Sequence, residues 1–112
     1  MSAFVANITI EQGTDFETSY NVFDPNSQAA VNISGYSVQA RMKHSYFTES
    51  YINLNPIFVN QIFGIVRIKL TAEETKVIRA GRYVYDVVLV SPGGIKKRVV
   101  EGVAEVVPGV TL

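Results

Sequence analysis

Few residues of this chain have the types and spacing that catalysis needs. The one histidine, His44, lies in a polar stretch beside Lys43 and Ser45. A hydrolytic triad needs a base that is oriented by a carboxylate and placed next to a nucleophile, and no nucleophile-elbow motif is present. Glu73 and Glu74 are adjacent on a predicted helical turn, so their carboxylates point in different directions. We therefore expect no catalytic residue and predict that the protein is not an enzyme.

Metal and cofactor sites have as little support. The chain contains no cysteine, which excludes disulfides and thiolate-bound metals. Asp15, Glu17 and Asp24 are close in sequence, but no loop has the dense spacing of oxygen ligands that calcium sites show. The "PGG" stretch of residues 92–94 is followed by no predicted helix, so it reads as a turn rather than a phosphate-binding loop. No metal and no cofactor is expected.

Aromatic residues in predicted loops are a stronger signal. Tyr46, Phe47 and Tyr51 cluster around the polar stretch 44–50. Apolar side chains at loop tips often mark contact with a partner protein. The alternative is that the same three residues form a flat platform for a carbohydrate of a host surface.

Two small basic clusters, Arg41–His44 and Lys96–Arg98, are further candidates for contact. The chain has ten Lys plus Arg and ten Asp plus Glu, so its formal net charge is zero. A nucleic-acid-binding domain normally shows a basic excess. We therefore expect no nucleic-acid partner and interpret the basic clusters as rim contacts to another protein.

The elements that must position these residues are predicted to be short strands. At 112 residues the chain is expected to form one domain over residues 1–112. Strand patterns alternate with turn signals about every ten residues, which is typical of a sandwich. The predicted strands are 4–10, 15–23, 35–43, 51–59 (broken at Pro56), 65–70, 82–90 and 95–107 (with a bulge near Glu101 and Gly102), and residues 24–28 are a predicted turn.

Two of these strands are expected to form the centre of the core. In 35–43, Tyr36, Val38, Ala40 and Met42 share one face, while Ser37, Gln39, Arg41 and Lys43 share the other. We expect the first set to pack against Tyr83, Tyr85, Val87 and Leu89 across the gap between two facing sheets.

The stretch "LTAEETKVIRAGRYVYDVVLV" joins a helical pattern to a buried strand. Thr71 and Glu74 form a capping-box pattern, and Gly81 is expected to end the helical turns. Immunoglobulin-like sandwiches cross between sheets at a corner of this kind, where a tyrosine hydroxyl bonds back to the corner. We predict an all-β, immunoglobulin-like, two-sheet antiparallel sandwich with a short helical corner near residues 71–78. Tyr83 is the predicted corner tyrosine, and Tyr85 stands where an antibody domain has its second cysteine.

The two ends of the chain are predicted to be free sheet edges. Both terminal segments have few charges and long apolar runs, including Val103, Val106 and Val107. Unpaired edges invite another chain to add a strand. We expect these segments to join the protein to copies of itself or to another protein, with the loop from Tyr46 to Tyr51 (the aromatic loop) as a side contact. No signal peptide and no apolar run of membrane-spanning length is visible, so we expect synthesis in the cytoplasm and no membrane partner.

Three stretches resemble a known family: "VNISGYSVQARMKHSY", "GIVRIKLTAEETKVIRAGRYVYDVVLV" and "KKRVVEGVAEVVPGVT". They are similar to short virion structural proteins of tailed bacteriophages, notably contractile-tailed phages of cyanobacteria, and more loosely to the immunoglobulin-like N-terminal domain of phage baseplate upper proteins. The resemblance covers most of residues 32–111, and "YINLNPIFVNQIFG" departs from it. It implies a non-enzymatic component of the virion, made in the host cytoplasm, that contacts other virion proteins in head decoration, neck, tail or baseplate.

Overall fold

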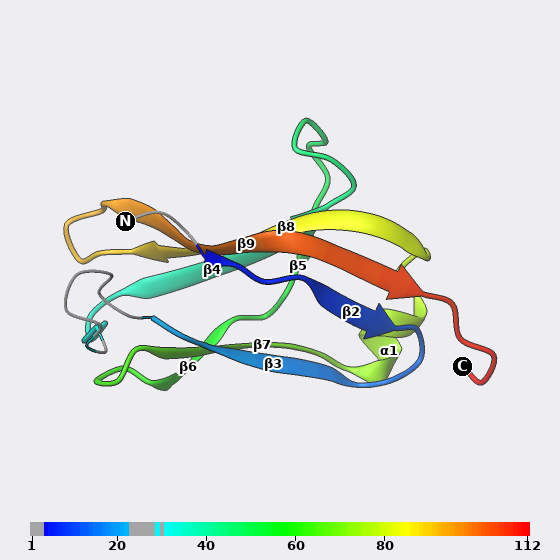
Figure 1. The fold of residues 1–112 in the computed structure, drawn as a ribbon, viewed down its shortest axis with the longest axis horizontal. Helices are drawn as coiled ribbons and strands as arrows, with labels where there is room; N and C mark the ends of the chain where they lie inside the picture. Colours follow the sequence, from blue (N-terminus) through cyan, green and yellow to red (C-terminus); the bar gives the residue numbers. More distant parts are fainter. Residues whose placement is uncertain (1–3, 23–28, 30) are drawn as a thin grey trace.

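The computed structural model describes residues 4–22, 29 and 31–112, so the predicted turn at 24–28 lies outside the described residues. Two β-sheets pack face to face (Figure 1). The predicted all-β sandwich is therefore confirmed. Its elements are β1 (Phe4–Val5), β2 (Ile8–Glu11), β3 (Phe16–Asn21), β4 (Ser37–Lys43), β5 (Ile52–Asn53), β6 (Ile57–Asn60), β7 (Ile65–Leu70), α1 (Ala72–Lys76), β8 (Gly81–Val90) and β9 (Lys96–Val107).

The first sheet has the strand order β1-β9-β8-β4-β5, with β2 also paired to β9, and the second has the order β3-β7-β6. All pairings are antiparallel except those of β1 and β2, which run parallel to β9. The sandwich thus has parallel pairing only where the N-terminal strands β1 and β2 lie beside the C-terminal strand β9 and run in the same direction.

The expected packing of β4 against β8 across the core is wrong. The two strands are hydrogen-bonded neighbours in the first sheet, where Val38 pairs with Leu89 and Ala40 with Val87. Alternation of apolar and polar residues shows which face of a strand is buried, but it does not show which strand lies beside it. Both sets of side chains instead point together toward the second sheet.

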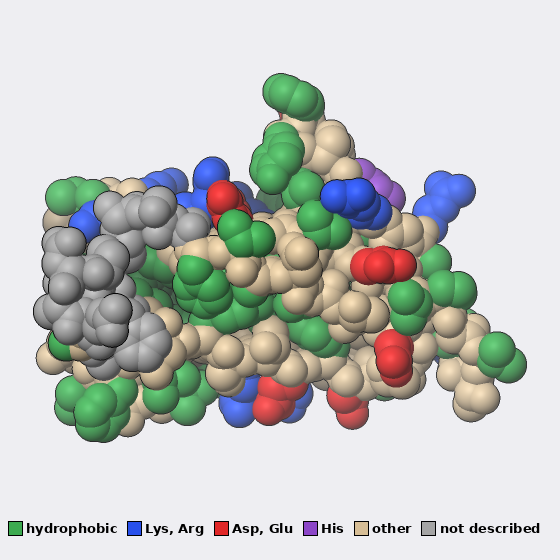
Figure 2. Space-filling view, in the orientation of Figure 1, with side chains coloured by type: hydrophobic (Ala, Val, Ile, Leu, Met, Phe, Trp, Pro, Cys, Tyr) green, Lys and Arg blue, Asp and Glu red, His purple; other side chains and the backbone are tan. Residues whose placement is uncertain are grey.

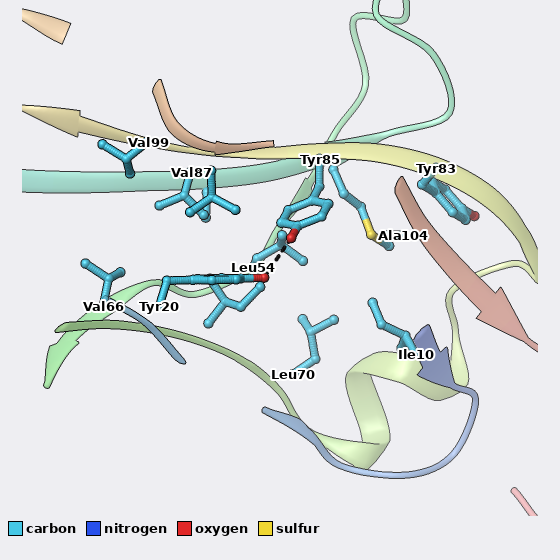
Figure 3. Close-up of a cluster of buried hydrophobic side chains, with 14 of the residues drawn as sticks. Ile10, Tyr20, Leu54, Val66, Leu70, Tyr83, Tyr85, Val87, Val99 and Ala104 are labelled. Atoms are coloured by element: carbon cyan, nitrogen blue, oxygen red, sulfur yellow. Dashed lines mark hydrogen bonds between the residues drawn. The ribbon is translucent and has the colours of Figure 1, made fainter. Parts of the chain in front are cut away.

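Side chains from the inner faces of both sheets fill the space between them (Figure 3). The second sheet contributes Tyr20, Val66, Ile68 and Leu70, and the first contributes Ala40, Met42, Tyr85 and Val87, all of them buried. Each of these sets follows the period of two that a strand requires. The sandwich core is therefore built from the alternation visible in the sequence.

The chain crosses from one sheet to the other at two points after β4. Between β5 and β6 it passes through Asn55, which has a φ of 52°, and Pro56. Asparagine tolerates this left-handed conformation, and proline cannot donate to a ladder, so the strand breaks where the sequence predicts. Between β7 and β8 the chain crosses through α1, as the helical pattern predicts.

The bulge in β9 lies earlier than expected. The register with β8 shifts between Val87 and Val88, where Val99 is the extra residue on β9. Gly102 has a different role, because a Cβ at this position would collide with the carbonyl oxygen of Ala6. The glycine therefore allows the N-terminal segment to approach β9 closely.

Candidate functional site

The loop between β4 and β5 projects away from the sandwich (Figure 1). Ser45 and Thr48 close a turn within it through a hydroxyl–hydroxyl bond of 2.9 Å and a backbone bond of 3.3 Å. Tyr46 and Phe47 lie within this turn and are 72% and 96% exposed. Hydrophobic side chains therefore gather at the tip of the loop (Figure 2). The turn thus presents two aromatic rings to solvent, and that of Phe47 is almost fully exposed.

Stacking interactions hold the base of this loop. The Arg41 guanidinium lies 4.2 Å from the centre of the Tyr51 ring, so a cation occupies one face of this half-exposed tyrosine. His44 stacks on Tyr83 with ring centres 4.3 Å apart. The histidine thus lies against one face of the buried corner tyrosine. The sequence did not predict this contact, because the two residues are distant in the chain.

The predicted corner lies between β7 and β8, and Tyr83 is bonded to it. The Tyr83 hydroxyl donates to the carbonyl oxygen of Arg79 at 2.6 Å. This is the bond back to the corner that the pattern predicts. Thr71 and Glu74 form a complete capping box, in which each accepts a hydrogen bond from the backbone of the other. The prediction that Gly81 ends the helical turns is wrong. Helix α1 ends at Lys76 with Val77 as its C-cap, and Gly81 begins β8 with a φ of 149°.

Tyr85 forms a contact between the two sheets that the sequence did not predict. Its hydroxyl oxygen lies 2.7 Å from that of Tyr20 on β3 (Figure 3). The Tyr85 hydroxyl also donates to the carbonyl oxygen of Ala6. Since the single proton of Tyr85 goes to Ala6, the Tyr20 hydroxyl is the donor to Tyr85. Burial raises the pKa of both phenols above that of an exposed tyrosine, so both keep their protons to higher pH than an exposed tyrosine does.

The prediction of free edges at the two chain ends is wrong for β9 but holds for the N-terminal segment: among the described strands, β1 and β2 pair with β9 alone and lie at the edge of the first sheet. β2 covers β9, so that Val106 pairs with Ile10 and Val107 pairs with Glu11. Val106 is 2% exposed and belongs to the core. The backbone N–H of Val103 donates to the Asn7 side chain at 3.0 Å. The C-terminal strand is therefore paired on both sides, and the N-terminal segment forms the edge of the sheet.

A hollow of about 310 Å³ lies on the outer face of the first sheet. Side chains of β4, β8 and β9 line it, and Tyr46 of the loop borders it. Arg98 lies 3.1 Å from Asp86 and 3.4 Å from Glu101, so one guanidinium bridges both carboxylates. The aromatic loop and the two basic clusters of the sequence therefore meet at one surface.

The acidic residues Asp15 and Glu74 accept hydrogen bonds from backbone N–H groups at the beginning of α1. Asp15 accepts a bond of 2.6 Å from the backbone of Ala72. Two hydrogen bonds lower the pKa of the Glu74 carboxyl: the larger effect comes from the backbone N–H of Thr71 and the smaller from the Asn55 amide.

Within residues 4–22, 29 and 31–112, no three His, Asp or Glu side chains lie close enough together to hold a metal ion. In the same residues, no helix has the length and apolar character needed to cross a membrane.

Comparison with known proteins gives no assignment: no family model matches the chain, and no curated protein matches it.

Proposed function

We propose that this protein is a non-enzymatic structural component of a tailed-phage virion and assembles by protein–protein contacts. The localisation is the virion, and the partners are other virion proteins and copies of this chain. The resemblance of residues 32–111 to short virion proteins motivates the proposal. The exposed aromatic side chains of the loop between β4 and β5 also support it.

The strand order supports the immunoglobulin-like part of the proposal. In such sandwiches one sheet holds strands B, E and D, and the other holds G, F, C and C′. The order β3-β7-β6 corresponds to the first of these, and β9-β8-β4-β5 corresponds to the second. Tyr20 and Tyr85 lie on the strands that correspond to B and F, which an antibody domain joins by a disulfide.

One observation best supports assembly through the loop: the exposure of Phe47. An aromatic ring that is 96% exposed at the tip of a self-supported turn gains nothing from the fold. Burying such a ring against a partner contributes about 2–3 kcal/mol. The loop is therefore the proposed anchor of the interface.

The test uses particles of the phage that encodes the chain. An antibody against the domain should label a defined part of the virion in negative-stain images. Phe47→Ser should fold normally and be missing from purified particles, while Val110→Ser, which removes another fully exposed apolar side chain, should be incorporated. Particles without label, or normal incorporation of Phe47→Ser, would contradict the proposal.

Carbohydrate binding is the second candidate, and one observation favours it. Tyr46 borders a hollow that also contains charged and amide side chains, the combination that orients a sugar ring. Arg41 already occupies one face of Tyr51, however, which reduces the proposed aromatic platform. A glycan-array signal that Tyr46→Ala abolishes would favour this candidate over assembly.

A further inference from the structure

Two basic clusters that are more than fifty residues apart in sequence line one hollow. Arg41 and Lys43 come from β4, and Lys96 and Arg98 come from β9. Strand β8 lies between them, because it pairs with both β4 and β9. The tertiary structure therefore builds one basic surface from segments that the sequence presents separately.

The charges of this surface are not balanced. Four basic and two acidic side chains line the hollow, although the whole chain is neutral. Arg98 already bridges both carboxylates, and Arg41 stacks on Tyr51. Lys43 and Lys96 have no ion pair among the described residues. The hollow thus has two cations available for an external partner.

The positions of the two lysines suggest the shape of that partner. In the register, Lys43 lies beside Val84 and Lys96 beside Val90, six residues further along β8. At about 3.4 Å per residue this is roughly 20 Å. An extended chain of about seven residues has the same length, so it can place one group near each lysine. Val84 at the Lys43 end and Val88 between the two lysines offer apolar contact, while Asp86 between them is already paired with Arg98.

We propose that this hollow binds an extended acidic peptide segment of a partner protein. The segment lies along β8 and places one carboxylate at Lys43 and another at Lys96, with small apolar side chains between them. This inference rests on the proposed function, because it gives the chemistry of the assembly partner that the aromatic loop contacts.

The test is a titration of the whole domain with the peptide Glu-Ser-Val-Ser-Val-Ser-Glu. In an extended chain every second residue faces the same side, so both glutamates and both valines can face the sheet. Amide NMR shifts should change along β4, β8 and β9. Raised salt should weaken the binding. The peptide with Gln at both ends, and the isomer with both Glu at one end, should bind more weakly.

Lysine variants locate the binding on the surface. Lys43→Gln and Lys96→Gln should each weaken the affinity about two- to fivefold, since exposed ion pairs contribute modestly. The double variant should lose about the product of the two factors. Lys69→Gln removes another exposed lysine without an ion pair among the described residues, on the second sheet, and should have no effect. Equal urea midpoints of the wild type and the four variants would show that folding is unchanged.

Several outcomes would overturn the inference. One is equal binding of the Gln-ended peptide, and another is equal weakening by Lys69→Gln. Tighter binding of a heparin disaccharide or a single-stranded oligonucleotide than of the acidic peptide would assign the hollow to a different ligand class. The titration uses no virion, so its failure overturns this inference alone, whereas the particle experiment with Phe47→Ser tests the proposed function.

Discussion

The hydroxyl pair of Tyr20 and Tyr85 should contribute measurably to the stability of the sandwich. Tyr20→Phe removes one hydrogen bond and leaves the donation of Tyr85 to Ala6 in place. We expect a loss of about 0.5–1.5 kcal/mol. Tyr85→Phe leaves both the Tyr20 hydroxyl and the Ala6 carbonyl without this partner. We expect a larger loss of about 1–3 kcal/mol, because unsatisfied buried groups cost more than a missing bond.

Equilibrium unfolding in urea measures both losses, and the double variant tests the coupling. If the hydroxyls act as one unit, the double variant loses about 0.5–1.5 kcal/mol less than the sum of the single losses. Tyr36→Phe is the matched control, since Tyr36 is half-buried and no hydrogen bond of its hydroxyl is seen in the described part of the chain. Additive losses, or single losses no larger than that of the control, would refute the reasoning.

The remaining predictions concern pH, packing and the corner. Burial raises the pKa of Tyr85, while an unfolded tyrosine titrates near pH 10. The contribution of the protonated Tyr85 to the free energy of unfolding is therefore complete below about pH 10 and is lost progressively above it, because the unfolded state releases the proton first. The urea midpoint should fall in alkali, and it should fall by less in Tyr85→Phe. Gly102→Ala should displace the segment around Ala6 and increase amide hydrogen exchange in β1 and β2. Thr71→Ala should cost about 1 kcal/mol by removing the N-cap of α1, measured by thermal unfolding. Tyr83→Phe should lower the urea midpoint by the equivalent of about 1–3 kcal/mol, and an unchanged midpoint would mean that its bond to the corner is unimportant.

Local features of the fold were predictable from the sequence. The alternation in 35–43 placed Ala40 and Met42 inside and Arg41 outside, as the structure has them. The capping box of Thr71 and Glu74 placed the beginning of α1, and Pro56 placed the break between β5 and β6. Each of these depends on residues within a few positions of one another, so the physical cause is contained in the local chain.

The aromatic loop was also predictable, since Tyr46 and Phe47 lie between two clear strand patterns with no apolar period of their own. Their exposure agrees with that interpretation. The partner that we propose for these two rings depends on a surface that lies outside this chain.

Pairing between distant segments was decided only by the tertiary structure. Alternation assigns a face to each strand, but sequence does not state that β4 lies beside β8 or that β2 covers β9, and for that reason Val106 was expected at an edge and lies in the core. The contact of Tyr20 with Tyr85 spans 65 residues, and the surface shared by Lys43 and Lys96 needs β8 between them. These contacts come from the packing of whole sheets, in which the free energy of burying both apolar faces together selects one arrangement of strands from several that the local patterns allow.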